Sequence, residues 1–277
     1  MSPEILLILL IFVSFVISLY GSLVGFGGGI FMVPILITIF HYPLHLAVGS
    51  CMISLVGSAL ISTYYNRKNS HVDFKMGILL EIPTMIGVVV GSLLLSYIAA
   101  EKLEYLFAVM VFLLGLSFFI KFKKRDENKE SFFSTLNKVK PRMVIKNHKN
   151  FVAYRVSVLM VIFFGSASGI LAGLFGVGGG FMKTPIMLKV FKIPPKIATA
   201  TALFMIIITG ITGSVSHYLQ GHIEFTKAWP VMLGFALGAL GSKQINTHLK
   251  DKTLEKMIGG GLLVAAIVMT ANFLYNH

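Results

Sequence analysis

Charged side chains are scarce in this sequence. Asp, Glu, Lys and Arg together make up 13% of its 277 residues, about half of the roughly 25% that is usual in soluble domains. Cysteine is limited to Cys51, which excludes an internal disulfide and a cysteine-based zinc site. No Gly-Lys-Ser/Thr motif follows the glycine-rich segments, so a phosphate-binding loop is not expected. With no catalytic or metal-ligating cluster either, the sequence predicts a protein that is not an enzyme and needs no cofactor or metal.

Long uncharged stretches take the place of the missing charge. A run of about 18 or more apolar residues is typical of a membrane-spanning helix, since about 20 residues cross the hydrocarbon of a bilayer. The first run follows Met1-Ser2-Pro3-Glu4, without the basic segment of a signal peptide, and is expected to be retained as a helix. The sequence therefore predicts an all-α, polytopic membrane helix bundle. The uncharged runs are 5–40, 44–65, 82–100, 157–182, 197–216 and 257–275.

The second half of the sequence repeats the first at a fixed offset of 151 positions. The two repeats are expected at residues 1–125 and 151–277, joined by a basic linker at residues 126–150. Each repeat opens with a hydrophobic segment that is interrupted by glycines. The offset places Gly25-Phe26-Gly27-Gly28-Gly29 on Gly176-Val177-Gly178-Gly179-Gly180, Pro34 on Pro185 and His71 on His222.

The number of crossings in each repeat decides whether the repeats are parallel or inverted. If residues 5–40 split at their glycines into helices near 4–24 and 28–40, each repeat has about five transmembrane segments and the second repeat is inverted. The alternative is eight spans with re-entrant loops and parallel repeats. The inverted arrangement is favoured because it places on the cytoplasmic side, with the linker, the Lys/Arg-bearing segments 66–75, 183–196 and 243–256.

The formal net charge of +13 is concentrated in part between the two repeats, where residues 121–150 hold ten Lys or Arg residues. Such a segment is expected to stay in the cytoplasm and to contact anionic headgroups of membrane lipids. No recognised nucleic-acid-binding motif accompanies it, so nucleic acid is not expected as a partner. The sequence leaves the oligomeric state open between a monomer and a homodimer.

The glycine runs predict a binding site for an anion. Consecutive glycines permit backbone angles that other residues avoid. Where a helix restarts after such a break, several N–H groups have no intrahelical partner and, with the positive end of the helix dipole, favour an anion. The alternative is that the glycines only allow tight helix packing. The candidate substrate-binding glycines are Gly27, Gly28 and Gly29, with Gly178, Gly179 and Gly180.

Small polar side chains follow each break and suit an oxyanion, because hydroxyl groups donate hydrogen bonds without a fixed charge. The alternative for each is a hydrogen bond between helices. The candidates are Ser50, Cys51 and Ser54 after the first break, and Thr199, Thr201 and Thr209 after the second.

Two charged residues interrupt the apolar runs. Lys183 follows the second glycine run and would either attract an anion or, as is favoured here, extend its ammonium group to the cytoplasmic surface. Glu81 lies in the run Gly77–Val90 and is a candidate for proton coupling, since an intramembrane carboxylate is costly. The favoured alternative is a satisfied carboxylate near a helix end. The pairs His71-x-Asp73 and His222-x-Glu224 are expected to cap helices rather than bind a metal.

The paired motif Gly-x-Gly-Gly-Gly-x4-Pro, which ends at Pro34 and again at Pro185, resembles that of the sulfite exporter TauE/SafE family, also called the 4-toluene sulfonate uptake permease family. The resemblance covers nearly the whole chain. It implies a multi-pass carrier in a bacterial inner membrane that moves sulfite, an organosulfonate or a related sulfur-containing anion, and it points to the two glycine runs and the polar residues after them.

Together these features predict a secondary transporter of a small sulfur-containing anion that works by alternating access, with proton coupling as an option. Two other readings stay open at this point. One is an anion channel, and the other is a membrane protein that binds a partner through its basic linker.

Overall fold

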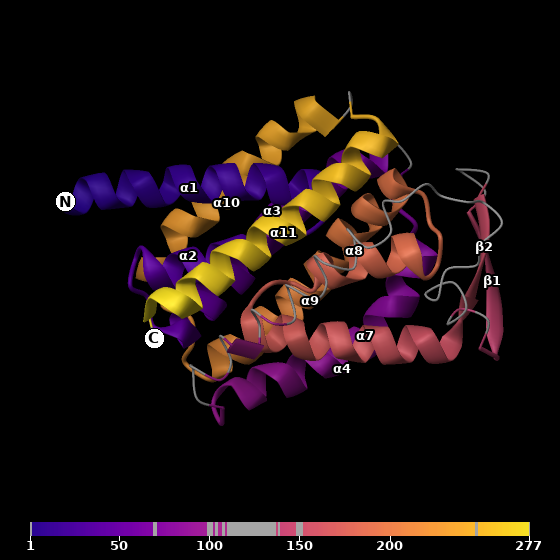
Figure 1. Ribbon diagram of the computed structural model, residues 1–277, viewed down its shortest axis with the longest axis horizontal. Helices are drawn as coiled ribbons and strands as arrows, with labels where there is room; N and C mark the ends of the chain where they lie inside the picture. Colours follow the sequence, from indigo (N-terminus) through magenta and orange to yellow (C-terminus); the bar gives the residue numbers. More distant parts are fainter. Residues whose placement is uncertain are drawn as a thin grey trace.

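The computed structural model describes residues 2–68, 71–98, 139–147, 152–246 and 249–276, with isolated positions between 102 and 137. Helices make up nearly all of the described chain (Figure 1). The end of the first repeat and most of the linker, residues 126–138 among them, lie outside the described residues except Asn137. The bounds expected for these segments therefore stay predictions.

In the first half, α1 spans Pro3–Val24, α2 Gly29–Thr38, α3 Leu44–Lys68 and α4 Phe74–Leu95. The side chain of Ser2 caps α1 by accepting a hydrogen bond from the N–H of Ile5. The carboxylate of Asp73 caps α4 in the same way through the N–H of Met76. This confirms the prediction that the His71-x-Asp73 pair marks the start of a helix.

In the second half, α7 spans Val158–Phe175, α8 Gly180–Lys189, α9 Pro195–Leu219, α10 Phe225–Asn246 and α11 Asp251–Asn276. Adding the offset of 151 to the bounds of α2, α3 and α4 gives the bounds of α8, α9 and α10, as in 29 + 151 = 180 and 38 + 151 = 189. The sequence repeat is therefore also a repeat of secondary structure.

A β-hairpin precedes the second set of helices, where only helices were expected. Strands β1, Arg142–Asn147, and β2, Val152–Ser157, pair antiparallel. In β2, Tyr154 and Val156 are buried while Ala153 and Arg155 are exposed, the period of two that a half-buried strand requires. The all-α prediction is wrong for this segment, which also crosses the expected boundary at residue 150.

The buried face of the hairpin packs on the helices. Ile145, Tyr154 and Val156 share one apolar cluster with Met76 and Leu80 of α4 and with residues of α8. The hydroxyl of Tyr154 donates a hydrogen bond to the carboxylate of Asp73. Burial and this contact together raise the pKa of Tyr154, so the phenol stays protonated. The hairpin is thus fastened to the end of α3 and the start of α4.

Removing that hydroxyl is expected to loosen the hairpin. Tyr154→Phe deletes a hydrogen bond to a carboxylate, a contact of about 1.5–3 kcal/mol. We expect trypsin to cleave after the exposed Arg155 at least about tenfold faster, because cleavage follows the population of the opened segment. Tyr97→Phe is the control, since that ring is 86% exposed. An unchanged cleavage rate would mean that apolar packing alone holds the hairpin.

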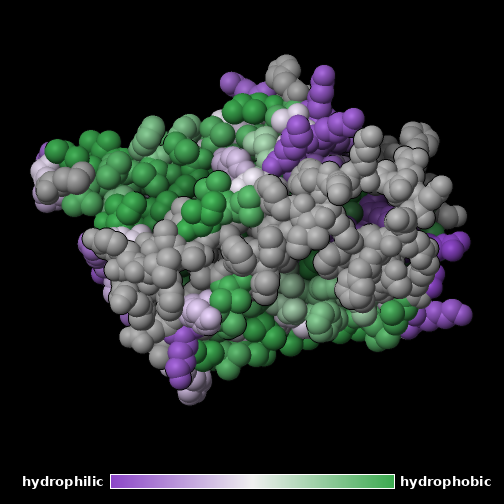
Figure 2. All heavy atoms as spheres, in the orientation of Figure 1, coloured by the Kyte–Doolittle hydropathy of each residue, from purple (hydrophilic) through white to green (hydrophobic). Residues whose placement is uncertain are grey.

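Five helices of the described chain are long and apolar enough to span a bilayer: α1, α3, α4, α7 and α9. Figure 2 shows hydrophobic side chains over α1 and along the edge formed by α4 and α7, with hydrophilic side chains gathered toward the hairpin end. Exposed Ile8 and Phe12 on α1 and Ile82 and Ile86 on α4 belong to this surface. A polytopic helical membrane protein is thus confirmed.

The short helices do not match the expected crossings. α2 and α8 have ten residues each, about 15 Å of helix, or half of a hydrocarbon core of about 30 Å. α2 also folds back along α1, since the Met32 sulfur lies 3.7 Å from the Ser14 hydroxyl. The expectation that residues 28–40 and their repeat each cross the membrane is therefore wrong.

Close helix pairs are formed between the halves. Gly165, Gly169 and Gly173 of α7 face the carbonyls of Leu80, Thr84 and Val88 in turn, so α7 runs parallel to α4. Likewise, Gly234 and Gly238 of α10 follow α1 in the same direction. Small residues at four-residue spacing let these backbones touch. The first helix of each half thus packs on the fourth helix of the other half.

The start of α3 lies beside the loop that follows α9. A Cβ atom added to Gly49 would stand 2.0 Å from the carbonyl oxygen of His222. The start of α9 in turn lies beside the loop that follows α3, since the Thr201 hydroxyl accepts from the N–H of Asp73 at 3.0 Å. These two central helices therefore run in opposite directions.

Candidate functional site

The two glycine breaks meet at the centre of the bundle. A Cβ atom added to Gly29 would lie 2.6 Å from the Cα atom of Val177, and one added to Gly180 would lie 2.5 Å from the carbonyl oxygen of Gly25. All six glycines predicted as site residues are buried. Two segments that the repeat relates to each other are thus neighbours in space, and the breaks form one structure.

The glycines also end and restart the helices. Gly25 and Gly176 cap α1 and α7 in the left-handed conformation, which glycine adopts without steric cost. Gly28 and Gly179 then stand at the N-cap positions of α2 and α8, with no side chain to accept from the first turns. The free donors and positive dipole ends of two helices therefore lie close together.

Apolar side chains cover these helix ends. Leu55 of α3 and Ile206 of α9 occupy equivalent positions in the two halves, and both lie against Gly27 and Gly178. A Cβ atom on either glycine would approach both side chains within 3.3 Å. Leu55 and Ile206 therefore cover the breaks on the side of α3 and α9.

The polar residues predicted after the breaks differ in what they contact. Thr199 donates to the carbonyl of Lys196 at 3.2 Å, and Thr201 accepts from Asp73. Ser54 donates to the carbonyl of Ser50 at 2.6 Å. Thr199 and Ser54 thus bond within their own helices, and only Thr201 among these three makes the contact between segments that the alternative reading expected.

Ser50 and Cys51 are different. Both are fully buried, and the Ser50 hydroxyl oxygen makes no hydrogen bond within the described part of the chain. A buried hydroxyl without a partner costs about 1–3 kcal/mol. Among the predicted polar residues of the first half, Ser50 is therefore the side chain with spare capacity for a ligand.

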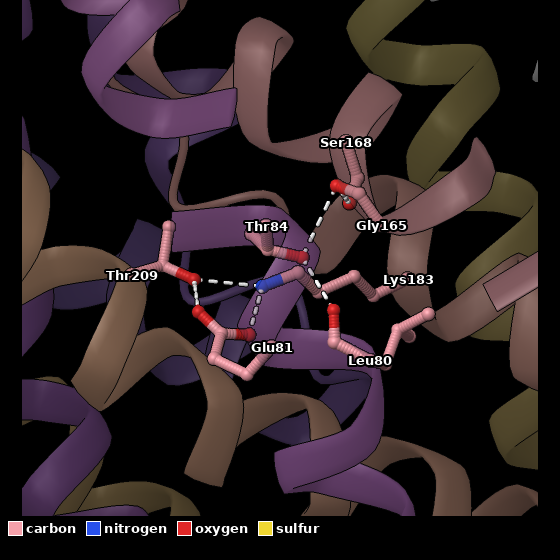
Figure 3. A network of polar contacts seen from close by, with 7 residues as sticks. All are labelled: Leu80, Glu81, Thr84, Gly165, Ser168, Lys183 and Thr209. Carbon is pink, nitrogen blue, oxygen red and sulfur yellow. Dashed lines mark hydrogen bonds and ion pairs between the residues drawn. The ribbon is translucent and has the colours of Figure 1, made fainter. Parts of the chain in front are cut away.

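An ion pair lies buried beside the second break. The Lys183 ammonium on α8 donates to the Glu81 carboxylate on α4 at 2.6 Å and to the Thr209 hydroxyl on α9 at 2.7 Å. Thr209 donates to the other oxygen of the same carboxylate (Figure 3). The side chains of Lys183 and Glu81 are 0% and 2% exposed. Three helices thus close one ring of polar contacts around two opposite charges.

The position of Lys183 contradicts the favoured reading of that residue. Its side chain does not extend to the cytoplasmic surface, because α8 begins inside the bundle at the break and its first turn points Lys183 toward α4. The reading of Glu81 also changes. Its carboxylate is satisfied, but by a cation 102 positions away rather than by proximity to a helix end. The one signal in the sequence is that each is a lone charge in an apolar stretch.

Two further hydroxyls, of Thr84 and Ser168, contact the Gly165 carbonyl where α4 packs on α7. The Thr84 hydroxyl lies 2.8 Å from the carbonyl of Leu80 and 3.1 Å from that of Gly165. Ser168 donates to the same Gly165 carbonyl at 2.9 Å (Figure 3). Because Gly165 has no side chain, α7 approaches α4 closely enough for these contacts. The helix that carries Glu81 is thereby fixed against α7.

The position that the repeat relates to this ion pair carries no ion pair. The positions equivalent to Lys183, Glu81 and Thr209 are Met32, Met232 and Ser58, and Met32 is buried. The repeat therefore places an ionic cluster at one of its two symmetric positions, and two methionines and a serine at the other. This asymmetry is a feature that packing alone does not require.

Comparison with known proteins places the whole chain in one family. Residues 10–269 match the family described as sulfite exporter TauE/SafE. The chain is 29% identical to the probable membrane transporter protein YunE of Bacillus subtilis over 260 residues, covering 89% of this chain and 91% of that protein. It is 23% identical to the probable membrane transporter protein YfcA of Escherichia coli, covering 100% and 92%. No solved structure gives a significant match.

A more distant relative carries the family name itself. The sulfite exporter TauE/SafE family protein 6 of Arabidopsis thaliana is 27% identical over 110 residues, which covers 38% of this chain and 26% of that protein. The family match, the relatives that match over most of their length and the apolar helices agree on a multi-pass membrane transporter rather than an enzyme. The chain belongs to the sulfite exporter TauE/SafE family.

Proposed function

We propose that this protein is a secondary carrier of a small sulfur-containing anion, working by alternating access between two inverted repeats. The observation that carries the proposal is the buried pair of Lys183 and Glu81 beside the start of α8. A buried cation already neutralised by a carboxylate is a weak contributor to stability. In a transporter it is instead a charge that an incoming anion can share.

Three contacts support inversion of the repeats. The central helices α3 and α9 run in opposite directions, since each begins beside the loop that ends the other. α1 and α10 run parallel to each other, as do α7 and α4. In Figure 1 both termini lie at the end of the molecule away from β1 and β2. The breaks then lie near the axis relating the repeats, where carriers of this type bind substrate.

The mechanism follows from the charges in the ring. Protonation of Glu81 removes its negative charge and frees the Lys183 ammonium, which a monoanion can then neutralise. The net charge of the buried site stays at zero before and after the exchange, so neither step leaves an uncompensated ion in the core. One proton is then carried with each monoanion. Thr209, Ser50 and the free N–H groups at Gly28 and Gly179 would donate to its oxygens.

The sulfur atom in the proposed substrate comes from the family and not from the ring. Sulfite and sulfonates present three oxygen acceptors around one centre, which suits donors arriving from several helices. The names of the family and of the Arabidopsis relative support sulfite as one such anion. We further propose a bacterial inner-membrane location with the basic linker in the cytoplasm against lipid headgroups.

Purified protein in liposomes tests this function. Sulfite, thiosulfate, sulfoacetate, taurine and sulfate are offered in turn, and uptake is followed with and without an imposed proton gradient. We expect saturable uptake of one or more sulfur monoanions, acceleration by inward proton flow, and counterflow when the same anion is preloaded. Uptake that never saturates and shows no counterflow would favour the anion channel instead.

A further inference from the structure

Three histidines gather at one end of the central helices. His45 lies at the start of α3, His217 in the last turn of α9 and His222 in the loop before α10. The rings of His45 and His222 have centroids 5.5 Å apart. The Nδ1 atoms of His217 and His222 lie 3.2 Å apart, and His217 Nε2 lies 2.9 Å from the Gly173 carbonyl. His45 is exposed, His222 is 9% exposed and His217 is fully buried, so the cluster leads from the surface into the bundle.

The hydrogen bonds fix the tautomers of the inner pair. A carbonyl oxygen only accepts, so His217 Nε2 carries a proton and donates it to Gly173. In the neutral ring, His217 Nδ1 is then an acceptor, and the Nδ1–H of His222 is the donor facing it. This leaves His222 Nε2 as the open acceptor of the pair.

The pair of His217 and His222 can bind one additional proton. Protonation of His222 at Nε2 gives an imidazolium whose Nδ1–H still donates to His217. A second proton would set two N–H groups against each other at 3.2 Å with two positive charges, an arrangement without any hydrogen bond. The two rings therefore titrate as one unit that accepts a single proton.

We propose that His217 and His222 form a proton-binding site that is loaded through His45 from the end of the protein opposite the hairpin. The position follows from α3, whose 25 residues extend about 37 Å. Its far end leads to Asp73, which binds Tyr154 of the hairpin, whereas its start carries His45. With the linker in the cytoplasm, the histidines face the exterior.

The surroundings of the pair contain few competing charges. α7 faces it with the Gly173 carbonyl, and α4 contributes Ser92 and Ser96, which bond to Ser216 and Gln220. On the loop and α10, Glu224 is exposed and paired with Lys227 at 2.9 Å. From α3 comes His45. Within the described residues, the imidazoles are thus the titratable groups that lie against one another here.

Partial burial and the neighbouring His45 lower the pKa of His222 below its usual value of 6.5. The His222 ring is therefore neutral at pH 7 and takes up its proton only as the outside becomes acidic. The unfolded chain binds that proton more readily, so loading slightly lowers the stability of the fold as the pH falls. Such a site responds to an acidic exterior and is empty at neutral pH.

The opposite end of the molecule lacks this site. The offset of 151 relates His45 to Lys196, His217 to Asn66 and His222 to His71. His71 donates its backbone N–H to Asn66, as His222 does to His217. The backbone geometry is therefore conserved between the halves, but an amide replaces the inner imidazole. Among the described residues, a histidine pair that can take up a proton is therefore found at this end of the central helices.

The pair is placed to act on the ion pair. His217 stands eight residues beyond Thr209 on α9, about 12 Å along the helix, and Gly173 lies three residues before the second break. If the proposed transport function holds, this pair is the proton-binding site on the exterior side of Glu81, at the far end of the same stretch of α9.

Nitrogen NMR of the full chain in lipid nanodiscs tests the proton site without any transport measurement. The protein is labelled with ¹⁵N-histidine, and the ring signals are followed from about pH 8 to about pH 5. We expect an Nε2–H tautomer for His217 throughout and one imidazolium per pair at acid pH, on His222. Two imidazolium rings in the same pair, or no change on either ring, would overturn the proposal.

His217→Asn is the matched variant, because asparagine stands at the equivalent position 66 and donates to a carbonyl there at 2.9 Å. Removal of the acceptor ring should shift the His222 transition by about 0.5 pH unit or more. In liposomes the variant should lose its response to external pH and keep its response to internal pH. A variant that transports like the parent but shows the NMR shift would leave the proton site intact and refute its coupling. No transport by either protein would refute the carrier instead.

Discussion

Lys183→Met should reduce anion transport by at least about 100-fold, the equivalent of losing about 3 kcal/mol of charge-assisted contact with the substrate. The variant removes the cation that the proposed mechanism offers to the anion. It also leaves the Glu81 carboxylate buried without its partner, which costs about 3–5 kcal/mol of stability unless the carboxylate takes up a proton. Uptake into liposomes and thermal unfolding in detergent measure the two effects separately.

A double variant separates transport from folding. Lys183→Met with Glu81→Met gives this position the residues of its symmetric counterpart, where Met32 and Met232 stand. Apolar side chains of similar volume often replace a buried ion pair without loss of stability. We therefore expect the double variant to unfold near the parent temperature and still fail to transport. Recovery of transport in the double variant would show that the pair is structural.

The matched control is an ion pair at the surface. Lys227 and Glu224 lie 2.9 Å apart with side chains 41% and 45% exposed, and an exposed pair of this kind contributes little to stability. Lys227→Met should leave both uptake and unfolding close to those of the parent. An equal loss of transport in this control would point to the net charge of the protein rather than to the buried site.

Gly180→Ala is expected to have the largest effect on folding. Its Cβ atom would lie 2.5 Å from the Gly25 carbonyl oxygen and 2.6 Å from the Ile206 Cδ1 atom, far inside a contact distance of about 3.5–4.0 Å. The first of these neighbours is backbone of the other break, so the two breaks must separate. We expect a loss of about 3 kcal/mol or more, or failure to fold, with Gly29→Ala behaving alike.

A graded series of glycines provides the controls. Gly179→Ala keeps its contacts beyond 3.2 Å but forces alanine to a φ of 70°, at a cost of about 1–2 kcal/mol. Gly57→Ala in α3 meets nothing within 4 Å and should be neutral or stabilising by up to about 1 kcal/mol. If Gly180→Ala unfolds like Gly57→Ala, the contact between the breaks is absent in the membrane.

Much of the fold follows from the sequence. The uncharged runs predict the long membrane helices, and the 151-residue offset predicts that α8, α9 and α10 repeat α2, α3 and α4. Asp73 marks the start of α4, and the glycine runs mark both breaks. These features are local, since hydropathy, capping and backbone freedom depend on a few neighbouring residues.

Other features required contacts between distant segments. The β-hairpin was missed because its alternation of Tyr154 and Val156 is short and because its two strands lie on either side of the boundary expected between the linker and the second repeat. The failure of α2 to cross the membrane was missed because its apolar residues continue an apolar run without any signal of where the helix ends. The histidine cluster depends on the start of α3 lying beside the end of α9.

The sequence by itself determined the class of protein, the duplication and the position of the two breaks, because composition, offset and glycine content are properties of the chain alone. Only the tertiary structure decided that the breaks touch and that Lys183 is paired with Glu81 rather than extended to the surface. The physical reason is the same in both cases. A buried charge must be neutralised by whatever helix packs against it, and which helices pack together is settled only when the two halves interlock.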